Sequence, residues 1–169
     1  MPDLRRLHAA HAPAVLAFER ANRAYFAASI SDRGDAYFAE FPARFDALLA
    51  DQEAGGGAYY VLVADDGTIL GRFNLIFTGA HTAELGYRVA EHAAGHGVAT
   101  ATVRELCLRA AADHGLRTLR AATAHENRAS RKVLAKAGFV PAGPADPAHL
   151  GGKSGTWFRR DLAQDGFEE

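Results

Sequence analysis

A β-hairpin pattern in the middle of the chain restricts the possible folds more than any other feature of the sequence. Two runs rich in β-branched, aromatic and aliphatic residues, Tyr59–Val63 and Thr68–Phe77, flank an Asp-Asp-Gly turn at residues 65–67. An Asp-Gly pair between two such runs predicts a tight antiparallel hairpin. After a second turn, Thr82–Val89 continues the pattern, so we expect a third strand of the same antiparallel meander.

Helical patterns precede and follow the meander. Before it, Ala9–Ala24 and Asp35–Glu53 carry apolar residues at helical spacing, and the second run ends at the glycines at 55–57. After it, Val98–His114 is a long apolar helix that stops at Gly115 and should be buried against a sheet. The apolar stripe of the second run, which we expect in the core, is Phe38, Phe41, Phe45, Leu48 and Leu49.

The C-terminal third of the chain alternates strand and helix patterns. We expect strands at Leu116–Thr123, Phe139–Ala142 and Thr156–Leu162, and a helix at Glu126–Ala137. Strands followed by such an alternation predict an α+β fold, with a mixed, mainly antiparallel sheet of about seven strands and helices on both faces. The polar tail at 163–169 is expected to fray.

Length and composition restrict the class of protein. The 169 residues suit a single domain over 1–169, because no repeat or linker interrupts the pattern. A net charge of −1 gives no overall field for nucleic acid, and the apolar runs are too short to span a membrane. The lone cysteine, Cys107, and the lack of an apolar leader favour a cytoplasmic protein.

The segment Ala94–Thr100 has the composition of a phosphate-binding loop. Its Gly95 and Gly97 allow close approach of the backbone to a ligand, and the following helix points free N–H groups toward it. The partial positive charge of a helix N-terminus, about +0.5, suits a pyrophosphate. The alternative is that these glycines only separate a strand from a helix.

Two other nucleotide-binding motifs fit this loop less well. A Walker loop needs Gly-Lys-Ser/Thr, which is absent, and a dinucleotide loop needs a small residue where Thr100 stands. A dinucleotide fold also expects an acid after the next strand, whereas Asp113 falls inside the predicted helix. The sequence therefore disfavours both motifs.

A series of motifs between Glu84 and Phe139 resembles the core of the GNAT acetyltransferases. In order, these are the strand Ala-Glu-Leu-Gly-Tyr-Arg-Val, the loop Ala-Gly-His-Gly-Val-Ala-Thr, a long helix, the strand Leu-Arg-Ala-Ala-Thr, Glu-Asn-Arg-Ala-Ser and Lys-Ala-Gly-Phe. The similarity is greatest to the RimJ/RimL branch, which acetylates protein N-termini, including those of ribosomal proteins. The resemblance implies an acyltransferase that moves an acetyl group from acetyl-CoA directly to a primary amine, without a metal.

The resemblance assigns acetyl-CoA to the glycine loop and the strand before it. The family's loop, Arg/Gln-x-x-Gly-x-Gly/Ala, maps onto Ala94, Gly97 and Ala99, so the leading Arg or Gln is missing here. Loop backbone donors are expected to hold the pyrophosphate, and the strand edge to pair with pantetheine where the sheet parts from the next strand. The implied cofactor-binding residues are Tyr87, Arg88, Val89, Ala94, Gly95, His96, Gly97, Val98, Ala99, Thr100, Asn127 and Ser130.

Glu84, Asn127 and Ser130 are the candidate catalytic residues. Transfer needs a neutral amine, and a carboxylate can take its proton directly or through water. The resemblance places Glu84 at the position of the general base in several GNAT enzymes; its alternative is a polar residue on a half-exposed strand. Asn127 and Ser130 share one helix face, and the resemblance implies that they contact the pantetheine arm or the acetyl carbonyl.

Ser130 is the candidate for protonating the leaving thiolate, by resemblance. Many GNAT enzymes use a tyrosine, and residues 126–138 contain none. Asn127 has the alternative of a simple helix N-cap.

Three further features have no assigned role in the reaction. His92 and His96 have the spacing of a metal pair only on a helix, which Gly95 interrupts, so no metal site is expected. Cys107 is expected to be a core residue. The basic residues between Arg128 and Lys136 suggest a solvated helix face.

The acceptor is expected to contact the first two helices, the segment Asn22–Asp35 and the loop Pro144–Gly155, none of which carries a known motif. The resemblance favours a protein N-terminus, and the alternative is a small amine such as a polyamine or an aminoglycoside, which acidic residues near the acceptor would favour. A non-catalytic acyl-CoA-binding module is a third hypothesis, because the loop Arg or Gln and the tyrosine are missing. No oligomeric state follows from the sequence, and a dimer stays open.

Overall fold

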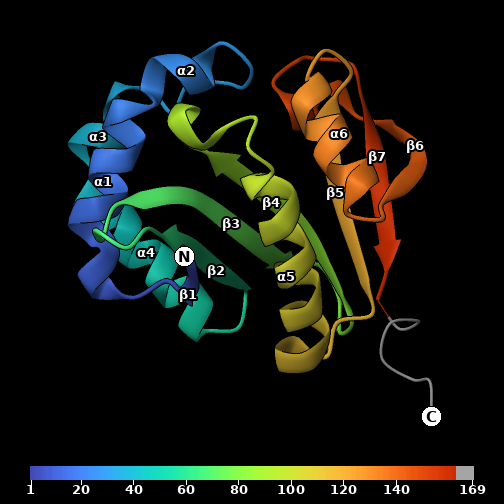
Figure 1. Cartoon of the computed structure of the whole chain (residues 1–169), viewed down its shortest axis with the longest axis horizontal. Coiled ribbons are helices and arrows are strands. Elements are labelled where there is room, and N and C mark those ends of the chain that lie inside the picture. Colours follow the sequence, from blue (N-terminus) through green and yellow to red (C-terminus); the bar gives the residue numbers. More distant parts are fainter. Residues whose placement is uncertain (163–169) are drawn as a thin grey trace. The chain divides into compact units, whose positions relative to one another are not determined.

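The computed structural model describes residues 1–162, which form a mixed α+β fold (Figure 1). Within them, a seven-stranded sheet has the order β1-β2-β3-β4-β5-β7-β6. The strands are β1 (Asp3–Arg6), β2 (Gly57–Val63), β3 (Ile69–Phe77), β4 (Thr82–Val89), β5 (Thr118–Ala124), β6 (Val140–Ala145) and β7 (Gly155–Asp161). The helices are α1 (Ala12–Ala21), α2 (Arg23–Ala27), α3 (Asp35–Ala39), α4 (Phe41–Glu53), α5 (Val98–His114) and α6 (Arg128–Lys136), with 3₁₀ turns η1 (Ala9–His11), η2 (Glu91–Ala93) and η3 (Pro147–Leu150).

The α+β class and the mainly antiparallel sheet confirm the prediction from sequence. The chain divides into two compact units, of which the first comprises residues 1–74 and 87–94. The second comprises 75–86 and the chain from 95 onward. Strands β3 and β4 contribute residues to both units, and a single domain stays a prediction. The tail at 163–169, predicted to fray, lies outside the described residues.

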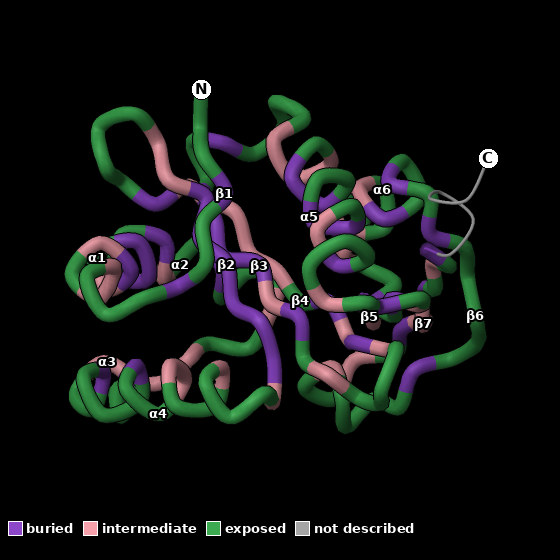
Figure 2. Tube along the Cα trace, turned by 90° about the horizontal axis from the view of Figure 1, so that it is seen from below, coloured by how far each residue is buried: buried purple, intermediate pink, exposed green. Residues whose placement is uncertain are grey.

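The predicted hairpin joins β2 and β3. The Ala64 N–H donates to the Thr68 carbonyl at 2.8 Å, and the Gly67 N–H donates to the Ala64 carbonyl at 2.9 Å. Gly67 has a φ of +87°, a conformation that strains other residues, so the turn requires its glycine. Strand β2 is buried along nearly its whole length (Figure 2).

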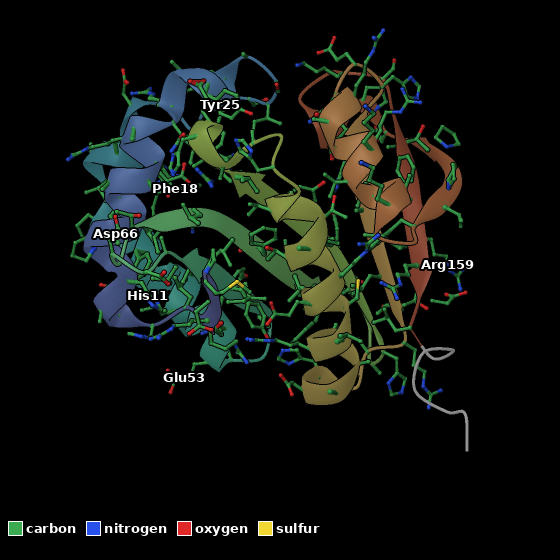
Figure 3. The ribbon with its side chains drawn as sticks, in the orientation of Figure 1. His11, Phe18, Tyr25, Glu53, Asp66 and Arg159 are labelled. Atoms are coloured by element: carbon green, nitrogen blue, oxygen red, sulfur yellow. The ribbon has the colours of Figure 1, made fainter. Side chains whose placement is uncertain are left out.

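The helical stripe of the first unit packs as predicted. Phe41 and Phe45 are 3% and 4% exposed, while Phe38, Leu48 and Leu49 lie partly buried against the same core. Phe18 of α1, labelled in Figure 3, joins this core.

The predicted helices of the first unit were too long. Asp35–Glu53 is two helices, α3 and α4, because Pro42 in the first turn of α4 has no N–H to donate and its ring crowds the preceding turn. Ala9–Ala24 is η1 and α1 followed by α2, with Pro13 in the first turn of α1. The sequence also missed β1, which pairs antiparallel with β2 through Leu4 and Leu62.

The second unit contains the parallel step of the sheet. The β4–β5 register covers Thr82 to Glu84 and ends at the pair Glu84 and Arg120, although β4 continues to Val89. Strand β7 pairs antiparallel with β5 and with β6, so it lies between them in the sheet order.

Helix α5 has the predicted bounds, Val98–His114, and ends at Gly115. Cys107, 2% exposed, is part of its buried face, as expected. No helix within residues 1–162 is long and apolar enough to cross a membrane.

Candidate active site

The glycine loop before α5 has a backbone that only glycine adopts easily. Gly95 and Gly97 have φ values of +78° and +76°, in the left-handed region. Gly97 is the N-cap of α5, and no side chain caps this helix. The first turn of α5 therefore lacks the side-chain acceptor that usually satisfies its N–H groups.

These N–H groups are available to a ligand. Within residues 1–162, no hydrogen bond uses the backbone N–H groups of Gly95, His96, Gly97, Val98, Ala99 or Thr100, and the first bond of the helix runs from the Ala101 N–H to the Gly97 carbonyl at 3.0 Å. Residues 94–97 are exposed and 98–100 are half-buried. Donors converging at a 17-residue helix's N-terminus fit a pyrophosphate without basic side chains.

The second half of β4 carries the other predicted cofactor residues. Tyr87, Arg88 and Val89 are half-buried, and the Tyr87 ring stacks on Phe73 with centroids 5.7 Å apart. The Arg88 side chain donates to Glu19 of α1 at 3.2 Å. Its Nη1 group therefore points to Glu19, and we expect its contact with acetyl-CoA to come from the backbone.

The predicted cofactor residues belong to both compact units. Tyr87, Arg88, Val89 and Ala94 are in the first unit. Residues 95–100, with Asn127 and Ser130, are in the second.

Asn127 is the N-cap of α6, which is the structural role predicted from the sequence as the alternative to a catalytic one. Its Oδ1 accepts from the Ser130 N–H at 3.2 Å, and both residues are half-buried. The structure thus brings this predicted pair together. Because the amide oxygen serves the helix, the Asn127 Nδ2 group is the part that can donate to a substrate carbonyl.

Glu84 has a partner that sequence reasoning missed. His149 of η3 lies with its Nε2 at 2.6 Å from Glu84 Oε1, and the two side chains are 43% and 25% exposed. An ionised carboxylate only accepts, so the imidazole Nε2–H donates to it. The His149 ring lies 5.0 Å from that of Trp157 on β7, and the guanidinium group of Arg120 lies 4.3 Å from the centroid of the Trp157 ring.

The loop holding His149 is fixed at both ends. Asp146 caps η3 by accepting from the Ala148 N–H at 2.9 Å, and Gly151 ends it with a φ of +64°. Gly155 lies just beyond, where a Cβ would collide with the Leu150 side chain and the Thr123 backbone. The Asp-Pro start and Gly-Gly end mark a turn in the sequence, but nothing local indicates that His149 reaches Glu84.

No group of three or more His, Cys, Asp or Glu side chains that could hold a metal ion occurs within residues 1–162. The candidate site consists of backbone donors, a carboxylate with an imidazole partner, and the amide and hydroxyl at the start of α6. Such groups can bind a phosphorylated thioester, accept an amine's proton and donate to a developing oxyanion.

Comparisons with known proteins agree with this chemistry. Residues 3–140 match the sequence model described as "Acetyltransferase (GNAT) domain". No curated protein matches the chain significantly.

The fold is similar to several solved acetyltransferases. The ribosomal-protein-S5-alanine acetyltransferase of Vibrio fischeri has a TM-score of 0.85 at 21% identity, with 98% of this chain and 94% of that one covered. Mycobacterium smegmatis RimJ, solved with CoA-disulfide, gives 0.82 at 22% identity, covering 98% and 84%. Spermidine N-acetyltransferase of Vibrio cholerae, solved with CoA and spermine, gives 0.79 at 15% identity, covering 96% of both chains.

Proposed function

Because the chain belongs to the GNAT acetyltransferase family and is an acetyl-CoA-dependent N-acetyltransferase, we propose that its acceptor is the N-terminal amine of a protein. The similarity in fold to the ribosomal-protein-S5-alanine acetyltransferase of Vibrio fischeri supports this choice. A polyamine is the alternative, supported by the similar fold of a spermidine acetyltransferase.

The pairing of acids in Asn22–Asp35 and in the loop Pro144–Gly155, two of the expected acceptor segments, favours a protein N-terminus. A polyamine carries several ammonium groups and needs carboxylates to hold them. Asp32 and Asp35, the acids of the first segment, both accept from Arg23 at 2.8 Å. Asp146, the acid of the second, caps η3. Within the described residues, neither segment offers a carboxylate without a partner.

The cofactor is held by the glycine loop in this proposal. The N–H groups of residues 95–100 bind the pyrophosphate, and the edge of β4 from Tyr87 to Val89 pairs with the pantetheine arm. Holding acetyl-CoA and the acceptor amine together is the main source of rate acceleration for two bound reactants.

Glu84 takes the amine's proton. Its Oε1 is occupied by the His149 N–H, whereas Oε2 makes no hydrogen bond within the described residues. The neutral amine attacks the thioester carbon, and the proton passes to Glu84 Oε2 directly or through one water. His149 is a positioning residue, because its N–H fixes the orientation of the carboxylate.

The remaining steps use the start of α6. Backbone N–H groups and Asn127 Nδ2 stabilise the oxyanion while the new C–N bond forms. The C–S bond then breaks, and Ser130 Oγ supplies a proton to the thiolate and regains one from water, while Glu84 releases the amine's proton to water.

Free thiol release from acetyl-CoA tests this function. The panel contains N-terminal peptides, spermidine and an aminoglycoside, with wild type, Glu84→Gln and Glu105→Gln. Glu105 of α5 is the matched control, since it is 47% exposed and paired with Arg109 at 2.8 Å. At pH 7 we expect peptides to be acetylated and Glu84→Gln to lower kcat/KM by about 100-fold, with Glu105→Gln unchanged.

The pH dependence separates a base from a merely structural residue. An N-terminal amine has a pKa of about 8 and loses its proton unaided at higher pH. The deficit of Glu84→Gln should therefore shrink above pH 9. A deficit that is constant with pH would overturn the base assignment, preference for spermidine would overturn the acceptor, and tight binding without turnover would favour the acyl-CoA-binding module.

A further inference from the structure

Glu19 of α1 is the most deeply buried charged residue of the first unit, and three arginines surround it. Its side chain is 1% exposed. Oε1 accepts from Arg72 and Arg33, each at 2.9 Å, and Oε2 accepts from Arg33 at 3.1 Å and Arg88 at 3.2 Å. We call these four residues the Glu19 cluster. They come from α1, the α2–α3 loop, β3 and β4.

The Glu19 cluster has a surplus of two positive charges, because it contains three guanidinium groups and one carboxylate. Nearby acids do not neutralise this surplus. Asp32 and Asp35 pair with Arg23, and Glu40 pairs with Arg44 at 3.1 Å. Tyr37, which accepts from Arg72 at 3.2 Å, is a neutral phenol.

The surplus charge is unfavourable in free energy at this position, because partial burial removes water from the guanidinium groups. Burial lowers the pKa of Arg88 to about 10, and repulsion from Arg33 and Arg72 acts in the same direction. Arg88 still carries its charge at neutral pH. An anion bound beside it would relieve this repulsion.

The arginines have donors to spare and are held in place. Arg88 Nε and Nη2 and Arg33 Nη1 donate no hydrogen bond within residues 1–162. Their side chains are 16% and 28% exposed, so a ligand can reach them, whereas Arg72 at 6% forms the buried floor. The guanidinium groups of Arg88 and Arg33 each lie 4.8 Å from an aromatic ring centroid, on Phe26 and Tyr37.

We propose that the Glu19 cluster binds a carboxylate group of the acceptor, through the free donors of Arg33 and Arg88. This deepens the proposed function and rests on it, since it specifies the acceptor as a protein N-terminus with an acidic side chain among its first residues. Arg33 lies in the segment that the sequence assigned to the acceptor. Planar guanidinium groups match the geometry of a carboxylate, often with two parallel bonds.

The cluster also bears on the alternative acceptor. A polyamine would bring further positive charge toward a surplus that already exists. An acidic peptide instead supplies the missing negative charge.

Peptide binding, measured by calorimetry on the full chain saturated with CoA, tests the proposal independently of turnover. Matched N-terminal peptides carry Asp or Asn at each of positions 2 to 5. We expect one Asp peptide to bind at least about 10-fold more tightly than its Asn counterpart, the scale of a hydrogen bond to a charged group. Spermidine should bind more weakly than either.

Variants identify the arginines as the cause. Arg33→Gln should reduce the Asp-to-Asn ratio to about 1. Arg44→Gln is the matched control, because Arg44 also lies over the Tyr37 ring, at 5.9 Å, but is paired with Glu40 and 49% exposed. It should keep the full ratio. Arg88→Gln, with its melting temperature recorded, repeats the test if Arg33→Gln does not fold.

Each outcome separates this inference from the proposed function. Equal affinity for Asp and Asn peptides that are acetylated overturns the inference alone. A preference for Asp peptides without acetylation supports the carboxylate site and overturns the acceptor assignment. If Arg33→Gln instead weakens CoA binding and peptides show no preference, the anion is a cofactor phosphate and the proposal is wrong.

Discussion

Glu19 and Glu84 are two carboxylates with opposite surroundings. Glu19, in the first unit, is 1% exposed and accepts from three arginines. Glu84, in the second unit, is 25% exposed and accepts from one imidazole. Both oxygens of Glu19 accept from guanidinium groups, whereas Glu84 Oε2 makes no hydrogen bond within the described residues.

This difference decides which acid can accept a proton. A carboxylate fixed among guanidinium groups is stabilised in its ionised form and is a poor base. A carboxylate with one hydrogen-bonding partner has a second oxygen left for an amine, as the proposed role of Glu84 requires. Burial and charge partners thus make Glu19 structural, and the more open surroundings of Glu84 agree with its proposed role as the base.

The largest expected effect is on stability, from Glu19→Gln. Removing this charge leaves three guanidinium groups without their buried partner, which should lower the free energy of unfolding by about 3 to 5 kcal/mol. Urea denaturation of wild type, Glu19→Gln and Glu84→Gln measures this free energy of unfolding. Glu84→Gln should change this free energy by less than about 0.5 kcal/mol; equal losses would remove the contrast between the two acids.

Low pH should reduce the stabilisation that the buried carboxylate of Glu19 provides. Burial alone would raise the pKa of Glu19, but the hydrogen bond from Arg33 and the charges of Arg33, Arg88 and Arg72 hold it below the ordinary 4.5. A depressed folded-state pKa stabilises the protein above pH 4.5, and this contribution is lost as pH falls through the folded value. The unfolding free energy of wild type should therefore drop in that acidic range. Glu19→Gln should lack this part of the drop, and parallel pH profiles would contradict the assignment.

His149→Phe tests the imidazole partner of Glu84. The aromatic ring can still pack on Trp157, but the hydrogen bond to Glu84 is lost, so kcat/KM should fall by about 10-fold, the scale of one hydrogen bond to a charged group. Thiol release measures the loss. His125→Phe is the control, because His125 lies 2.9 Å from Thr156 Oγ1 and not beside Glu84. A larger loss of kcat/KM in the control than in His149→Phe would contradict a role for His149 in catalysis.

The smallest expected effect belongs to a carboxylate that has an arginine but no burial. Glu40 is 61% exposed and pairs with Arg44 one helical turn away. Glu40→Gln should change the unfolding free energy by less than about 0.5 kcal/mol, because water screens exposed pairs. A loss as large as that of Glu19→Gln would show that the arginine partner, and not burial, sets the difference.

Local signals in the sequence predicted most of the fold. The Asp-Gly turn at 65–67, the apolar run of α5 and the glycine at 115 specify their elements within a few neighbouring residues. Strand β1 was not predicted, because Leu4 is its only buried side chain and gives no alternating pattern. Its formation depends on pairing with β2.

The site was predictable only where its groups are close in sequence. The glycine loop and the Asn127–Ser130 pair are local, and both were found. Their catalytic and binding roles stay predictions. His149 is 65 residues from Glu84, and Arg88 is 69 residues from Glu19. Only the folded chain brings these partners together, and no spacing pattern in the sequence predicts their contacts.

The position of His149 depends on the glycine at residue 155, which restricts the residues that homologues can carry there. A single added methyl at residue 155 would strike Leu150, the residue next to His149, and the Thr123 backbone. Homologues that keep a histidine against the strand glutamate should therefore keep glycine here. Because the same methyl would also strike the Thr123 backbone, lineages that lose the histidine should still keep the glycine.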